Sequence, residues 1–320
     1  MKKVWAIIAV LSLSGLAAGQ AGSNPQETNL LKAASDGDIA QVQQLLQQGA
    51  DINSRDNQGW TPLIWAAYQG HTDVVTLLLS KGANMKAKGS AGQTALHEAG
   101  FMGHTGILLL LLSKGAKIAA KDKKDWPALA EAASQDNVQA VNLLLSKRVS
   151  VDAKDEPNGE TPLITAAETG KVDMVKLLLS KGAKIEAPDN DGATALVNAA
   201  YKGHADVIAT LLAAGADIES KASAYPNEGA TALMEASGRG KTDAITVLLS
   251  KGAKIEARDK NGWTPLIWAG DMGQTDAAKL LLDKGADINA KGNDGNTALH
   301  WAINEQHPDT AKLLQGRGAK

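Results

Sequence analysis

The sequence predicts an all-α repeat protein, a solenoid of about nine stacked helix-turn-helix units joined by β-hairpin-like fingers. Three observations predict this fold. Thr-x-Leu-like triplets recur at residues 28, 61, 94, 127, 161, 194, 231, 264 and 297, with spacings of 33, 33, 33, 34, 33, 37, 33 and 33 residues. Leu always stands two and seventeen residues after these anchors, and Ala always stands five residues after them. The 44% hydrophobic content is mostly Ala and Leu with a single Phe, which suits short, closely packed helices better than a β-sandwich.

The second copy shows how each unit is built, with positions counted from its anchor, Thr61. Thr61 is placed to cap a helix, and the Pro that follows it fits the first helical turn, where its missing N–H is tolerated. Gly70 ends this helix, and a second one runs from about Thr72 to Lys81. Gly82 fits the left-handed residue that closes a helix, and a polar finger, residues 83–92, leads to the next copy. Two helices this short cannot bury their apolar faces alone, so the copies must stack.

These residues resemble the ankyrin repeat. The motifs that carry the resemblance are Gly59-Trp60-Thr61-Pro62-Leu63, Ala66-Ala67, Gly70-His71, Leu77-Leu78-Leu79 and Lys81-Gly82-Ala83. The resemblance covers roughly residues 28 to 320 and implies an ankyrin solenoid. One departure is that the usual histidine of the Thr-Pro-Leu-His motif appears only as His97 and His300. In the other copies we expect burial of the replacing side chain to take the place of the hydrogen bonds that this histidine makes to the finger, without a change of fold.

The fourth copy departs from the repeat at several positions together. Pro127 stands at the anchor, Asp125 and Asp136 replace glycines, and Arg148-Val149 replace Gly-Ala. A side chain held in the left-handed region costs on the order of 1 kcal/mol. We therefore expect residues 125–150 to be the least stable segment, dividing the array into copies one to three and five to nine. The alternative is that neighbouring copies compensate fully.

The first 21 residues are typical of a Sec-type signal peptide. Lys2 and Lys3 precede an apolar run, Val4 to Leu16, and small residues follow, with cleavage expected after Ala21 or Gly19. The run is shorter than the roughly 20 residues that span a bilayer, and no later stretch is long enough. We expect residues 22–27 to be a short linker, and the mature protein to be periplasmic or secreted, with no membrane span.

The charge and the cysteine content limit the classes of partner and of chemistry expected for this chain. Lys and Arg number 33 against 35 Asp and Glu, a net charge of −2, and signal cleavage would remove two lysines and give −2 − 2 = −4. Because the chain has no excess of positive charge to attract phosphate groups, nucleic acid is not an expected partner. The chain has no Cys, which excludes disulfides, thiolate nucleophiles and zinc fingers.

Three motifs resemble catalytic or metal-binding signatures but are incomplete. His97-Glu98 begins like a zinc-protease helix, but Phe101 occupies the place of the second histidine. Residues 238–242, Gly-Arg-Gly-Lys-Thr, end like a phosphate loop, yet Glu235 replaces its first glycine, so we interpret them as a helix–helix turn. Residues 189–192 suggest calcium but lack the first and last carboxylates, so a solvated turn is favoured. We expect no enzymatic activity, cofactor or metal. The six histidines fall at two repeated positions and are interpreted as structural.

Function in such an array is expected where the copies differ, because stacking requirements are shared and recognition is local. Position +4 holds Lys, Trp, Glu, Thr or Asn, so we interpret it as open to solvent. Positions +7 and +8 lie on the same helical face as +4. In the ankyrin family this face, with the finger tips, forms the groove where partners dock. The candidate partner-binding residues are Trp60, Trp65, Tyr68, Phe101, Met102, Trp126, Tyr201, Tyr225, Trp263, Trp268 and Met272.

The sequence therefore predicts a monomeric, exported, non-catalytic scaffold that binds a protein. The resemblance to exported bacterial ankyrin proteins implies a role such as an accessory, protective or inhibitory subunit. Residues 59–66 and 262–269 are identical, Gly-Trp-Thr-Pro-Leu-Ile-Trp-Ala, and would give two aromatic stations. One alternative is a glycan or small-molecule binder that stacks rings on these stations. Another is a secreted factor that acts on proteins of another organism. A purely structural alternative is that Trp65 and Trp268 pack on neighbouring fingers.

Overall fold

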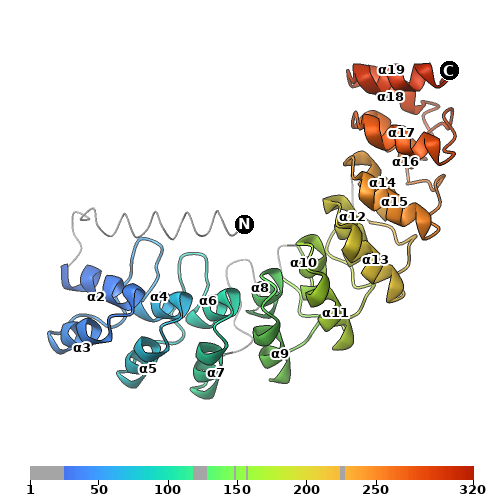
Figure 1. Ribbon diagram of the computed structural model, residues 1–320. Coiled ribbons are helices and arrows are strands. Elements are labelled where there is room, and N and C mark those ends of the chain that lie inside the picture. Colours follow the sequence, from blue (N-terminus) through green and yellow to red (C-terminus); the bar gives the residue numbers. More distant parts are fainter. Residues whose placement is uncertain (1–24, 118–127, 148, 156–157, 224–227) are drawn as a thin grey trace. The chain divides into compact units, whose positions relative to one another are not determined.

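A computed structural model describes residues 25–320 except 118–127, 148, 156–157 and 224–227 (Figure 1). The expected signal peptide, residues 22–24 of the expected linker, Trp126 and Tyr225 lie outside the described residues. Each repeat contributes two α-helices, giving 18 in the described part of the chain. The first helices of the repeats are α2 Pro25–Asp36, α4 Pro62–Gln69, α6 Ala95–Met102, α8 Ala128–Ser134, α10 Pro162–Glu168, α12 Ala195–Lys202, α14 Ala232–Gly238, α16 Pro265–Asp271 and α18 Ala298–Asn304.

The second helices follow after short turns. They are α3 Ile39–Gln47, α5 Thr72–Ser80, α7 Thr105–Ser113, α9 Val138–Ser146, α11 Val172–Ser180, α13 Ala205–Ala213, α15 Thr242–Ser250, α17 Thr275–Asp283 and α19 Pro308–Gly316. This arrangement confirms the predicted all-α repeat solenoid.

The predicted helix signals act as expected in the second repeat. Thr61 Oγ1 accepts a hydrogen bond from the Ile64 N–H, with Pro in the first turn, and Gly70 closes α4 at φ 89°. Gly82 takes φ 88° after α5. In the fourth repeat Asp136 is held at φ 63°, a left-handed conformation that among the described residues only Gln306 shares outside glycine.

The chain divides into two compact units. Unit 1 comprises residues 1–150 and 155–157, and unit 2 comprises residues 151–154 and 158–320. Within unit 1 the first helices pack in the order α2, α4, α6, α8, and the second helices pack in the order α3, α5, α7, α9 (Figure 1). Unit 2 repeats this with α10 to α18 and α11 to α19. Repeat four therefore packs with repeats one to three, in unit 1.

The invariant residues form the core of each unit. The Ala at +5 is at most 1% exposed in all nine copies, and the Leu at +17 is at most 7% exposed. Burying each such Leu contributes roughly 2 kcal/mol. The small Ala side chain lets successive helices approach closely, which explains why the array is built from Ala and Leu.

The fingers are turns joined to one another by backbone hydrogen bonds. Ser90 N–H donates to Gln58 O at 2.6 Å, and Asn293 N–H donates to Asn261 O at 2.8 Å in the equivalent place. The described fingers contain one isolated β-bridge, Lys221 to Thr231, and no regular strand. Among the described residues, no helix has the length and apolar character needed to cross a bilayer.

Candidate functional site

The structure contradicts the expectation that the tryptophans face solvent. Trp65 is 0% exposed, Trp60 2%, Trp268 7% and Tyr68 9%, so all four belong to the core. Position +4 is closed in repeats three and seven although it is charged there, since Glu98 and Glu235 are buried, whereas Lys32 in repeat one is exposed. The inference that a position tolerating Glu must be open was therefore wrong.

A finger carboxylate explains why position +4 accepts both Trp and polar residues. Trp65 Nε1 donates to Asp56 Oδ2 at 2.8 Å, and Trp268 Nε1 donates to Asp259 Oδ2 at 3.0 Å. In repeat six the Asn198 amide donates to Asp189 Oδ2 at 2.9 Å. The other carboxylate oxygen accepts backbone N–H groups of the finger, such as that of Trp60. In repeats two, six and eight, position +4 thus faces a carboxylate, and its side chain holds the finger on the helix.

Burial of this carboxylate has an electrostatic cost. Desolvation raises the pKa of Asp56, and hydrogen bonds from the Trp60 backbone and the Trp65 indole act in the opposite direction. The indole therefore compensates for part of the water that the carboxylate lost.

The tryptophan before the anchor is also structural. Trp60 packs against Trp65 with ring centroids 4.7 Å apart and against Tyr68 at 5.3 Å. A Cβ at Gly89, in the next finger, would lie 2.8 Å from Trp60 Cδ1, and one at Gly292 would lie 2.9 Å from Trp263 Cδ1. The fingers that follow Trp60 and Trp263 therefore carry glycine where other repeats carry the Asp, because a Cβ there would meet the indole.

Two arginines that the sequence analysis missed complete this arrangement. Arg55 donates to Gly59 O in its own finger and to Lys88 O in the next, both at 2.7 Å. Arg258 makes the same pair of bonds to Gly262 O and Lys291 O. The signal was an Arg-Asp pair shortly before both identical octapeptides. These octapeptides are bracing modules, so the glycan-binding alternative loses the exposed indoles on which it depended.

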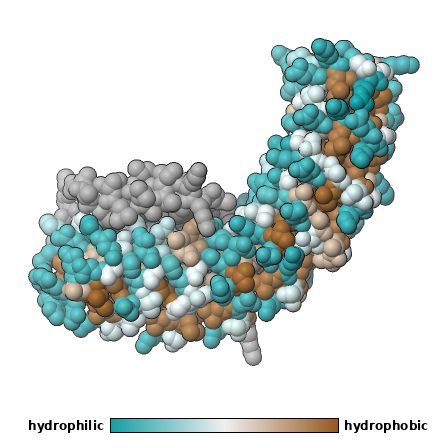
Figure 2. Space-filling view, in the orientation of Figure 1, coloured by the Kyte–Doolittle hydropathy of each residue, from teal (hydrophilic) through white to brown (hydrophobic). Residues whose placement is uncertain are grey.

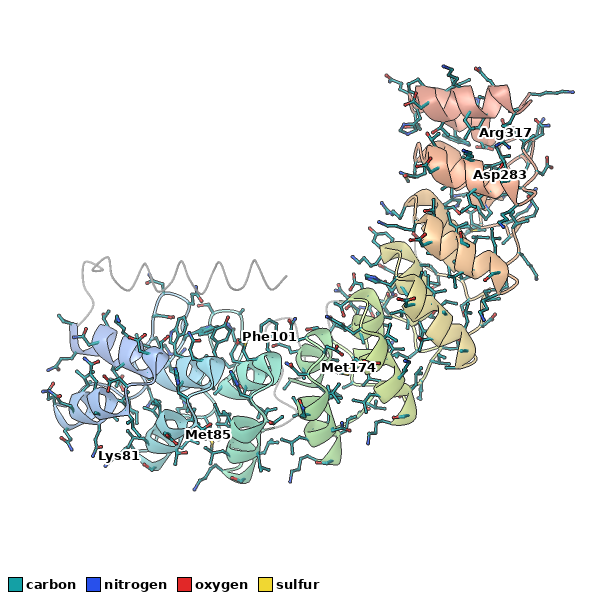
Figure 3. All side chains as sticks on the ribbon, in the orientation of Figure 1. Lys81, Met85, Phe101, Met174, Asp283 and Arg317 are labelled. Carbon is teal, nitrogen blue, oxygen red and sulfur yellow. The ribbon has the colours of Figure 1, made fainter. Side chains whose placement is uncertain are left out.

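The accessible candidates lie at positions +7 and +8, the carboxyl ends of the first helices. Met102 is 40% exposed and Met272 43%, while Phe101 and Tyr201 are partly exposed; Trp263, directly before its anchor, is also partly exposed but packs against the core. Figure 3 shows Phe101 at the end of α6. We define strip 1, in unit 1, as Gln69, Phe101, Met102 and Gln135, and strip 2, in unit 2, as Glu168, Thr169, Tyr201, Lys202, Arg239, Met272 and Glu305.

The two strips differ in charge. Strip 1 is neutral, with an aromatic ring, a thioether and two amides. In strip 2, Lys202 Nζ lies 2.8 Å from Glu168 Oε1 and 5.1 Å from the centre of the Tyr201 ring. The Arg239 guanidinium stacks on the same ring at 4.4 Å.

Comparison with known proteins identifies the repeat. A family model described as ankyrin repeats (3 copies) matches residues 30–122, 129–222 and 221–292, and a single ankyrin repeat matches residues 294–320. The chain belongs to the ankyrin repeat family. Ankyrin repeat proteins are generally non-catalytic scaffolds that mediate protein binding. No curated protein matches this chain closely enough to narrow that role.

The histidines of this ankyrin repeat protein join adjacent repeats. At position +10, the Nε2 atom lies 2.9 or 3.0 Å from the carbonyl oxygen 36 residues earlier, in the pairs His71–Ser35, His104–Tyr68, His204–Glu168 and His307–Asp271. The His97 ring accepts a hydrogen bond from the Thr94 N–H at 3.2 Å. These contacts agree with the structural interpretation of both positions.

The two other motifs are turns of the ankyrin fold. Residues 238–242 connect α14 to α15, as predicted. Asp189 Oδ1 accepts the N–H groups of Asp191 and Ala193, so this carboxylate closes its own turn. Within the described ranges, no three His, Asp or Glu side chains are grouped so that they could hold a metal ion.

Figure 2 shows the surface character of one face of the molecule. Hydrophobic residues appear there in groups between hydrophilic ones in both units. Other described large hydrophobic side chains that are well exposed are Ile39, Leu109 and Ile303, which lie outside the two strips.

Proposed function

We propose that this ankyrin repeat protein is an exported, non-catalytic scaffold that binds another protein through strips 1 and 2. The observation that supports the proposal is that position +8 remains accessible in all nine repeats, and +7 at Phe101 and Tyr201, while the residues there differ from repeat to repeat and +2, +5 and +17 are invariant. Of the residues expected to bind a partner, Phe101, Met102, Tyr201 and Met272 remain candidates. The other role is structural: the buried side chains of Trp60, Trp65 and Trp268 pack inside the repeats that carry these positions.

The proposed mechanism is surface complementarity on a rigid base. The strip 1 residues, and Tyr201, Lys202 and Glu305 of strip 2, stand at the ends of helices whose next turn is fixed by an inter-repeat bond, such as His104 to the Tyr68 carbonyl. Rigid side-chain positions reduce the ordering entropy lost on docking. A mixture of partly exposed aromatic, thioether and polar groups is typical of protein interfaces.

The signal-like residues 1–21 support export to the periplasm or beyond. A role as an accessory or inhibitory subunit of another envelope protein is consistent with that location. Fractionation tests the location: the protein is expected in the periplasm or the culture supernatant, and recovery of the uncleaved chain from the cytoplasm alone would contradict export.

Affinity purification from the periplasm and the supernatant tests binding. The wild type is compared with Phe101→Ala/Met102→Ala in strip 1 and with Tyr201→Ala in strip 2. The matched control is Leu109→Ala, which removes a more exposed apolar side chain (51%) from the second helix α7. Loss of a specific prey in a strip variant but not in the control supports the proposal. The same prey list from all four proteins would contradict the strips, and no specific prey with any of them would contradict the scaffold role.

A further inference from the structure

Strip 2 contains cations that the protein itself does not neutralise. Lys202 is paired with Glu168, but neither Arg239 nor Lys241 forms an ion pair or a side-chain hydrogen bond within the described residues. Lys241 stands where other repeats carry the +10 histidine, and its methylene stem lies over Gly203, next to Lys202. Asp243, two residues later in the first turn of α15, does not pair with Lys241 either. The carboxyl ends of α12 and α14 thus place two cations, Lys202 and Arg239, against the Tyr201 ring, and Lys241 follows in the turn before α15, with Glu168 paired to Lys202.

The geometry of Arg239 leaves its donors available. The Arg239 Cζ atom lies 4.4 Å from the centre of the Tyr201 ring, a contact that restrains the guanidinium, and no acceptor among the described residues takes up its N–H groups. A planar guanidinium held in this way matches the two oxygens of a carboxylate. Arg239 is exposed, so such a carboxylate can approach from solvent.

An apolar side chain stands beside these cations. Met272, 43% exposed, packs over Gly238, the residue before Arg239, where a Cβ would lie 3.7 Å from Met272 Cγ. An inorganic anion would leave this methionine uncovered, whereas a peptide can place an acidic residue on Arg239 and an apolar neighbour on Met272. The chain as a whole carries a net charge of −2, so a cationic cluster is a local feature rather than a general one.

From this arrangement we propose that Tyr201, Lys202, Arg239, Lys241 and Met272 form the docking site for an acidic segment of the partner protein. Arg239 and Lys241 bind its carboxylates, and Tyr201 and Met272 contact an apolar residue between them. This inference rests on the proposed scaffold function and specifies the chemistry of the partner.

Fluorescence anisotropy tests the site with a defined probe, a short fluorescein-labelled peptide rich in Glu and Leu. The full-length protein is expected to bind it saturably, and Arg239→Gln/Lys241→Gln should weaken binding by about tenfold or more. The matched control is Lys181→Gln/Lys251→Gln, which removes the same charge from exposed residues that follow α11 and α15 and should change affinity less than about twofold. Circular dichroism verifies that both double variants are folded.

Three outcomes would overturn the proposal. The first is no saturable binding, and the second is equal affinity for a peptide in which Gln replaces every Glu. The third is displacement by inorganic phosphate well beyond that of chloride at matched ionic strength, which would indicate a small-anion site. Any partner protein captured by the wild type allows a separate test. If Arg239→Gln/Lys241→Gln still captures that protein undiminished, the proposed docking site is wrong, while the scaffold function stands.

Discussion

At the scale of single residues, the finger aspartates connect sequence to stability. Asp56 and Asp259 accept both the backbone of their own finger and the indole at +4, so one side chain fixes the finger to its helix. Removing such an acceptor leaves buried donors unpaired, which costs more than the bond itself contributes.

Asp56→Ala tests this role. It removes the acceptor of the Trp65 indole and of two finger N–H groups, so the free energy of unfolding of unit 1 should fall by about 1–3 kcal/mol. Urea unfolding followed by tryptophan fluorescence measures the change. Asn57→Ala, at the exposed tip of the same finger, is the control, and an equal effect of the two substitutions would show that the carboxylate has no special role.

Asp271 gives stability a pH dependence of predictable sign. Desolvation raises its pKa above the ordinary value of 3.8, the Glu305 charge adds to this, and His307 acts in the opposite direction. The protonated form of Asp271 contributes stability that is fully present below pH 3.8 and is lost as the pH rises through the raised pKa. Asp271→Asn should therefore raise the melting temperature at about pH 7 and have little effect at about pH 3. Calorimetry at the two pH values measures this, and a variant destabilised at neutral pH would refute the sign.

At the scale of elements, repeat four shows both a defect and a compensation. Asp136 is strained at φ 63°, yet the next residue, Asn137, donates to the carbonyls of Gly100 and Phe101 at 2.9 and 2.6 Å. Asn137 thus replaces the histidine bond that other repeats use. The expected instability of residues 125–150 stays a prediction.

Asp136→Gly separates strain from compensation. Glycine adopts the left-handed conformation without the Cβ penalty, so the variant should be more stable by about 1 kcal/mol. Hydrogen exchange should also slow in α8 and α9, which in the wild type should exchange faster than α10 to α13. Gln135→Gly is the control and should not stabilise. Wild-type exchange in α8 as slow as in α10 would show that neighbouring repeats compensate fully.

At the scale of the whole molecule, the division into two units predicts separable unfolding. Leu63 and Leu163 are each 1% exposed and occupy the same position in repeats two and five. Each truncation to Ala should cost about 2–5 kcal/mol, but in different units. In guanidinium unfolding, Leu63→Ala should lower the midpoint of one transition and Leu163→Ala that of the other. If both variants shift one common transition, the array unfolds as a single cooperative unit.

The sequence predicted the fold because the residues that recur in every repeat are those that packing and turn geometry require. Thr61, Gly70, Gly82 and the invariant Leu and Ala positions recur for local reasons, and the structure places them as expected. The candidate site was only partly predictable. Met102 and Met272 are exposed at +8, but Trp65 at +4 is buried, because variation at a position can reflect a changing partner as well as solvent.

By itself, the sequence determined the repeat length, the positions of the helices and the invariant Leu and Ala of the core, since these follow from turn chemistry and helical periodicity within one unit. Only the tertiary structure decided which variable residues reach solvent. The acceptors of the Trp65 and Trp268 indoles lie in fingers nine residues earlier, and the rings of Trp60 and Trp263 pack on the finger of the next repeat. Such contacts depend on how chain segments meet in space, and no pattern within a single helix contains them.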